Sequence, residues 1–103
     1  MIKVSVLYPN EEGKKFDMEY YVNKHMPMVQ GKLGASLKGV AIEQGLCGAE
    51  PGSPATYIAM GHLYFDSLEA FQTAHGPHAE WMMEDVPNYT DIQPTFQISE
   101  VKL

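Results

Sequence analysis

The chain has 103 residues, enough for one domain (residues 1–103), and 45% of them are hydrophobic, which is much apolar surface for so small a protein to bury alone. The formal net charge of −6 disfavours binding to nucleic acid or to an anionic membrane surface. No secretory signal and no membrane span is expected, and the single cysteine, Cys47, excludes an internal disulfide and fits a cytoplasmic location. Cys47 is predicted to be a buried, unreactive thiol.

The first half of the chain predicts two strands with helical segments between them. Residues 2–8 alternate between apolar and more polar side chains, as in a strand with one buried face. Asp17 is the predicted N-cap of a helix that Pro27 should end around residues 24–26. Pro27 then opens a second short helix, closed by Gly34, and residues 37–46 form the second strand.

The second half of the chain also predicts two strands with helical segments between them. Residues 55–65 predict the longest strand, and its two apolar faces indicate that both are covered. Asp66 or Ser67 caps the helix that follows, and a further short helix precedes the last strand, residues 92–101. The order β-α-β-β-α-β is typical of an α+β, ferredoxin-like domain, in which a four-stranded antiparallel sheet carries helices on one face.

The sheet face away from the helices would be bare in a monomer. An exposed apolar sheet of this size is unusual in a soluble protein, so we expect two protomers to stack these faces as a dimeric α/β barrel. Such a homodimer would enclose a chamber between its sheets. The polar side chains predicted to line it are those of Ser5, Gln97 and Ser99, joined by His62 and Tyr64 if the third strand presents them there.

His25 is the first candidate for catalysis. It stands at the predicted helix end, two residues before Pro27 and just behind Tyr20 and Tyr21. Imidazole exchanges protons near neutral pH, so it suits a general base or acid that acts on an acidic C–H or an enol. The alternative is that His25 only hydrogen-bonds a final helix carbonyl.

His62 is the second catalytic candidate, because it shares a strand face with Tyr64. If that face looks into the barrel, both side chains contact a ligand; if it lies under the helices, His62 is a core histidine. Aromatic residues at helix or strand spacing are core by default, yet Trp81 beside Met82 and Met83 would suit a pocket wall. The predicted substrate-binding residues are Tyr20, Tyr21, Tyr64, Trp81 and Gln97.

No metal site and no cofactor are predicted. His75 and His78 are close in sequence, but a Gly-Pro break separates them, so they do not share a helical face as a ligand pair normally would. A solvated helix terminus is the favoured interpretation. Glu84 and Asp85 are likewise predicted to be solvated surface.

Three segments carry a resemblance to a known family. They are FDMEYYVNKHMPMV (16–29), LYFDSLEAFQTA (63–74) and EDVPNYTD (84–91). In order and spacing they resemble the EthD family of small dimeric α/β-barrel proteins. The resemblance implies a ferredoxin-like protomer, a homodimer and a cytoplasmic role in the breakdown or tailoring of ethers, aromatic rings or polyketide-like compounds.

The resemblance limits the chemistry less than the shape. Proteins of similar architecture include lactone isomerases, cyclases and monooxygenases without cofactor. Some similar sequences are called EthD family reductases, but the chain has no Gly-rich dinucleotide fingerprint to support that label.

Three functional hypotheses remain open. The first is a cofactor-independent enzyme that binds a hydrophobic, oxygen-bearing catabolic intermediate and transfers a proton through His25, aided by His62 or a tyrosine, in an isomerisation, cyclisation, dehydration or cofactor-free oxygenation. The second is a non-catalytic small-molecule binding or accessory protein of a degradation pathway. The third is a structural dimer without a ligand. An enzyme should bring His25 and another polar group to an enclosed cavity.

Overall fold

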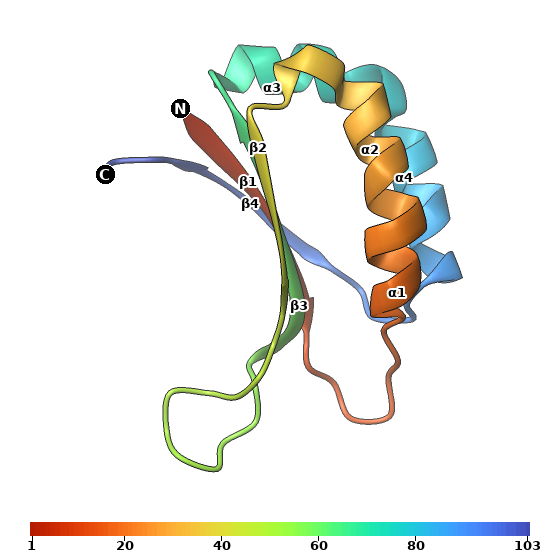
Figure 1. The fold of residues 1–103 in the computed structure, drawn as a ribbon, viewed down its shortest axis with the longest axis vertical. Helices are drawn as coiled ribbons and strands as arrows, with labels where there is room; N and C mark the ends of the chain where they lie inside the picture. Colours follow the sequence, from red (N-terminus) through yellow and green to blue (C-terminus); the bar gives the residue numbers. More distant parts are fainter.

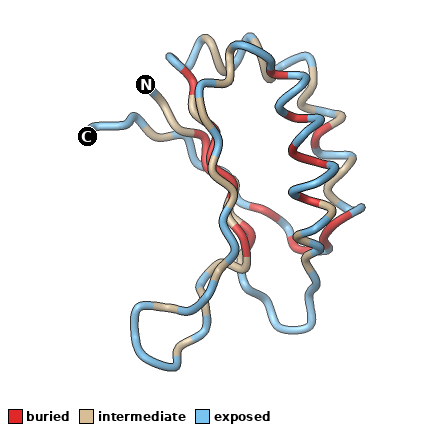
Figure 2. The backbone as a smooth tube through the Cα atoms, viewed as in Figure 1, coloured by how far each residue is buried: buried red, intermediate tan, exposed pale blue.

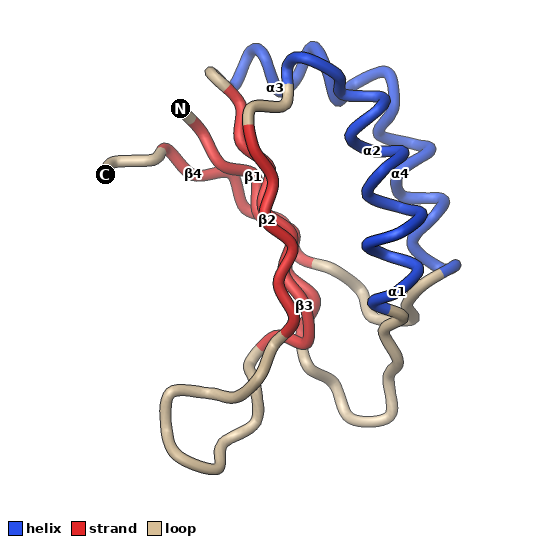
Figure 3. Tube along the Cα trace, viewed as in Figure 1, coloured by secondary structure: helices blue, strands red, loops and turns tan.

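The computed structural model describes all residues, 1–103, and forms two layers, a sheet and a set of helices against one of its faces (Figure 1; Figure 3). The strand order is β2-β3-β1-β4, and every neighbouring pair is antiparallel. The predicted α+β architecture is therefore confirmed. The elements are β1 (Ile2–Pro9), α1 (Met18–Tyr20), a π-helical turn (Tyr21–His25), α2 (Met26–Leu33), β2 (Gly39–Gln44), β3 (Tyr57–Phe65), α3 (Leu68–His75), α4 (Ala79–Asp85) and β4 (Thr95–Glu100).

The register of the sheet assigns side chains to its two faces. Val6 of β1 pairs with Gly61 of β3 and Phe96 of β4, and this row lies beneath the helices. Because successive strand residues point to opposite faces, the next row lies on the uncovered face. That row joins Ser5 to His62 and Gln97. The sequence left open which face of residues 55–65 lies under the helices, and the register places His62 on the uncovered face. The buried segments of the sheet and of the helices face each other (Figure 2).

The predicted helix starts are confirmed. The Asp17 carboxylate accepts a hydrogen bond from the Tyr20 N–H at 3.0 Å. Ser67, of the two candidates, is the N-cap of α3, since its hydroxyl accepts from the Ala70 N–H at 3.0 Å. Each cap satisfies a backbone donor that the first helical turn leaves without a partner.

The first helix does not end before Pro27, so that prediction is wrong. The Met26 N–H donates to the Tyr21 carbonyl five residues back, which makes a π-helical turn. Proline has no N–H to donate, and its ring crowds the carbonyl four residues earlier. The widened turn just before Pro27 accommodates both effects, and the helix continues to Leu33. Gly34, with φ of 59°, ends it as predicted.

The loop between β2 and β3 extends beyond the end of the sheet (Figure 1). Cys47 lies in this loop and is exposed, which corrects the prediction of a buried thiol. No helix combines the length and the apolar character that crossing a membrane requires.

Candidate functional site

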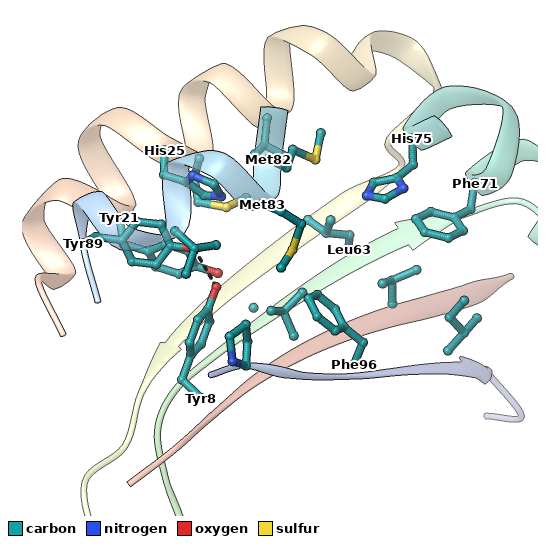
Figure 4. A pocket seen from close by; sticks show the side chains of 18 residues that line it. Tyr8, Tyr21, His25, Leu63, Phe71, His75, Met82, Met83, Tyr89 and Phe96 are labelled. Atoms are coloured by element: carbon teal, nitrogen blue, oxygen red, sulfur yellow. Dashed lines mark hydrogen bonds between the residues drawn. The ribbon is translucent and has the colours of Figure 1, made fainter. Parts of the chain in front are cut away.

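An apolar hollow of about 320 Å³ lies between the sheet and the helices (Figure 4). Hydrophobic residues make up 14 of the 18 that line it. Leu63 of β3 contributes to its floor, and Met82 and Met83 of α4 reach over it. Phe96 and Ile98 of β4 form an open rim, because these side chains are 55% and 46% exposed. The expected chamber lay between two protomers, whereas this hollow lies within one protomer, on the other face of the sheet.

His25 borders the hollow and is paired with a carboxylate. Its Nδ1 lies 2.8 Å from Oδ2 of Asp85, and the two side chains are 8% and 12% exposed. The other carboxylate oxygen accepts hydrogen bonds from the Tyr20 hydroxyl and the Asn88 amide, each at 2.9 Å. Three donors therefore converge on one carboxylate.

The charge of Asp85 follows from these contacts. Burial by itself would raise the pKa of its carboxyl, but the hydrogen bonds from Asn88, His25 and Tyr20 outweigh burial and lower this pKa below its ordinary value. An ionised carboxylate accepts hydrogen bonds only, so Nδ1 of His25 carries a proton. Nε2 of His25 has no hydrogen-bond partner, and every fully occluded side-chain nitrogen of the chain has one, so Nε2 is not fully occluded.

Aromatic rings hold the imidazole in place. His25 stacks with Tyr21, with ring centroids 5.6 Å apart, and with Trp81, with centroids 6.0 Å apart. The π-helical turn presents Tyr21 and His25 on the same side of the helix. A ring that stacks on two aromatic neighbours and is hydrogen-bonded at Nδ1 has little freedom to rotate, so the direction of Nε2 is restricted.

Three phenols converge at the same end of the hollow. The hydroxyls of Tyr8 and Tyr89 share a hydrogen bond of 2.8 Å, and Tyr21 packs against both rings. Burial raises the pKa of all three phenols, so they stay neutral and can donate hydrogen bonds. The Tyr21 hydroxyl occupies the space that a Cβ would fill at Gly61, so only glycine leaves room for it.

The structure divides the predicted site residues between the two faces of the sheet. Tyr21 and His25 line the hollow, while Trp81 stacks on the His25 imidazole and the Tyr20 hydroxyl donates a hydrogen bond to Asp85. The sheet separates His25 from the residues on the uncovered face, which are His62, Tyr64 and Gln97.

His62 ties three strands together. Its Nδ1 lies 2.9 Å from the Ser5 hydroxyl, and its Nε2 lies 3.4 Å from a Glu43 carboxylate oxygen. It is buried and does not line the hollow. Within one protomer the two histidines therefore do not share a site.

The predicted catalytic and substrate-binding residues did not include four that the structure places at the site: Tyr8, His75, Asp85 and Tyr89. Asp85 was predicted to be solvated, and this was wrong because α4 turns it toward His25. His75, predicted to lie at a solvated helix terminus, borders the hollow instead. A carboxylate in a short helix next to a Trp-Met-Met run is the only local signal for Asp85. No group of three or more His, Cys, Asp or Glu side chains is placed to hold a metal ion.

Comparisons with known proteins agree with this architecture. The family model described as the EthD domain matches residues 11–93. The crystal structure of an EthD-like protein from Ralstonia eutropha has a TM-score of 0.94 and 44% identity, over 99% of this chain and 92% of that one. An uncharacterised 11.0 kDa protein of Rhodococcus erythropolis, from the thcB-thcC intergenic region, is 32% identical over 86% of this chain and 84% of its own length.

A more distant structure supports the fold alone. It is a protein from Bacteroides fragilis, described as dimeric, of unknown function and with a ferredoxin-like fold. Its TM-score is 0.60 at 12% identity, over 97% of this chain and 95% of that one.

Proposed function

Because the chain belongs to the EthD family, we propose that it is a cofactor-independent enzyme that binds a hydrophobic, oxygen-bearing small molecule in the hollow and moves a proton through His25. The observation that carries this proposal is the His25–Asp85 pair at the edge of an apolar hollow. Asp85 holds the Nδ1 proton and leaves the lone pair of Nε2 free to act as a base.

The neighbouring phenols supply the second half of such a reaction. When Nε2 removes a proton from carbon next to a carbonyl, negative charge develops on the carbonyl oxygen. A neutral phenol of Tyr8 or Tyr89 donates a hydrogen bond to that oxygen and stabilises it. The imidazolium then returns the proton at another position, which completes an isomerisation, or after ring closure, which completes a cyclisation.

The alternative function is a binding or accessory protein that carries the same ligand without changing it. The mostly hydrophobic lining of the hollow favours this alternative, because apolar contacts bind a ligand without catalysing a reaction. A carrier has no need for a carboxylate that fixes the imidazole tautomer, so Asp85 favours the enzyme. A cytoplasmic role in the catabolism of ethers, aromatic rings or polyketide-like compounds belongs to the same proposal.

The proposed assembly is a homodimer through the uncovered sheet face. This face carries Leu7, Met60 and Tyr64 beside His62, and no helix covers it. A structural relative of 12% identity is described as dimeric. In such a dimer each protomer keeps its own hollow, because the hollows lie on the outer side of the paired sheets.

The test uses an enolisable apolar ketone, 2-tetralone, whose C–H exchange in D₂O is followed by mass spectrometry. The wild type should accelerate deuterium uptake, and His25→Gln should lose about 10²–10⁴-fold of that acceleration, the usual contribution of a positioned base. Asp85→Asn should lose part of it, and His78→Ala, outside the hollow, should retain it. Binding of 2-tetralone without faster exchange in the wild type would favour the carrier.

A further inference from the structure

His75 is a second imidazole in the hollow, and the proposed proton transfer does not use it. It ends α3, borders the hollow and stacks on Phe71 with ring centroids 4.8 Å apart. No hydrogen bond or ion pair within the chain occupies its ring nitrogens, and none of them is fully occluded. Both ring nitrogens of His75 therefore have no partner within the chain, in a side chain that borders an otherwise mostly apolar hollow.

The protonation state of His75 narrows what it can bind. Burial lowers the pKa of its imidazole, and nearby His78 lowers it further, so the neutral form prevails at neutral pH. A neutral imidazole donates one hydrogen bond and accepts another. This pattern suits a hydroxyl or a carbonyl oxygen better than a carboxylate, which would pair with a cation.

His75 and His25 stand at opposite ends of the hollow (Figure 4). The ring of Phe71, which supports His75, packs on Phe65, whereas the Tyr21 hydroxyl beside His25 lies on Gly61. Gly61 and Phe65 share one face of β3 and are four residues apart, which is a rise of about 13 Å in a strand. A ligand that touches both imidazoles must therefore be elongated.

We propose that His75 binds a second oxygen of the ligand, so that the substrate of this hollow is a long apolar molecule with a hydroxyl or carbonyl oxygen at each end. This inference rests on the proposed function, in which His25 and the phenols engage the first oxygen. The apolar frame between the two oxygens lies against Leu63, Met82 and Met83.

The probes are 4-hydroxybiphenyl and 4,4′-dihydroxybiphenyl, which share a rigid apolar frame and differ by one terminal hydroxyl. Their dissociation constants are measured by isothermal titration calorimetry. The wild type should bind the diol about three- to tenfold more tightly, the usual contribution of one additional hydrogen bond. His75→Phe keeps the stack on Phe71 and removes both nitrogens, so its preference for the diol should vanish while its affinity for the mono-phenol stays within about twofold.

Two further variants separate hydrogen bonding from structure. His75→Gln restores a donor and an acceptor and should recover part of the preference for the diol. His78→Ala should keep all of it, because His78 does not border the hollow.

An equal preference for the diol in the wild type and in His75→Phe would overturn the inference. So would the absence of any preference in the wild type. In either event faster 2-tetralone exchange would leave the proposed function standing. If the wild type binds neither 4-hydroxybiphenyl nor 4,4′-dihydroxybiphenyl, the inference is overturned too. If it also fails to accelerate the deuterium exchange of 2-tetralone, the proposed function is overturned with it.

Discussion

His25 and Asp85 are 60 residues apart in the chain, yet their side chains form a hydrogen bond of 2.8 Å at the centre of the site. The carboxylate receives hydrogen bonds from three side chains, so it is stabilised as an anion although it is mostly buried. The same contacts that prepare the imidazole for proton transfer therefore also stabilise the fold, and this link can be measured through pH.

Asp85→Asn tests that link. The pKa of Asp85 in the folded protein lies below its ordinary value of 3.8. The ionised form therefore stabilises the fold above that value, and the stabilisation is lost as pH falls through the lower, folded-state pKa. The variant should be less stable by about 1–3 kcal/mol at neutral pH, and this difference should shrink below about pH 4.

Urea denaturation between pH 3 and pH 7 gives the free energy of unfolding for both proteins. Glu84→Gln, an exposed neighbour, controls for the loss of one negative charge. A difference between Asp85→Asn and the wild type that stays constant over the whole pH range would contradict the assignment.

Gly61→Ala tests the fit of Tyr21 against the sheet. The new methyl group would meet the Tyr21 hydroxyl, which is the end of a rigid ring that is only 2% exposed. We expect a loss of about 1–3 kcal/mol in unfolding free energy, as in other overpacked cores. The matched control is Gly31→Ala in α2, where the new methyl group meets nothing within 4 Å.

Gly31→Ala should gain about 0.5–1 kcal/mol, because alanine is the better helix former. Chemical denaturation measures both changes. Equal effects of the two substitutions would show that Tyr21 moves aside freely.

At the scale of elements, the widened turn before Pro27 determines how the site is built. Consecutive residues of an α-helix are about 100° apart around the helix axis. The additional residue of the π-helical turn therefore rotates the part of the helix after His25 by about that angle. Tyr21 and His25 are four residues apart and share a helix face, and the rotation brings Met26 and Val29 of α2 to the hollow as well. The widened turn before Pro27 thus contributes to the alignment of α2 with the two site residues.

The start of α3 gives a test at the same scale. Ser67→Ala removes the hydroxyl that caps the Ala70 N–H and should cost about 1 kcal/mol. Asp66→Ala removes only a 3.8 Å contact with Lys38 between exposed side chains and should cost less than about 0.5 kcal/mol. Thermal unfolding compares the two variants. A larger loss for Asp66→Ala would show that the cap is assigned to the wrong residue.

At the scale of the whole molecule, the sheet has a hollow on one face and an uncovered surface on the other. Met60 lies on the uncovered face of β3, across from Leu7 and Glu43. In the proposed homodimer this central position is buried. A charge there would have to be desolvated without a partner, which costs several kcal/mol.

Sedimentation at micromolar concentration should therefore show a dimer for the wild type and a monomer for Met60→Glu. Lys32→Glu, on the exposed side of α2, serves as the control and should remain dimeric. A wild-type monomer under these conditions would remove the homodimer from the proposal.

Local signals explain why the sequence predicts the fold well. Strand alternation, the caps at Asp17 and Ser67 and the turn at Gly34 each depend on residues a few positions apart. The site depends on longer separations: Tyr8 meets Tyr89 across 81 residues, and Asp85 meets His25 across 60. The position of His25 at a cavity was predicted, but neither its carboxylate nor the face of the sheet that holds the cavity has a local signature.

The alternation of side chains along β3 has a last consequence. Gly61 and Leu63 serve the hollow, while Met60 and His62, which alternate with them along the strand, serve the opposite surface. Inserting or deleting one residue in this strand would exchange the two sets and spoil both surfaces at once. The loop that carries Cys47 faces no such constraint, so changes of length among homologues should gather there and spare β3.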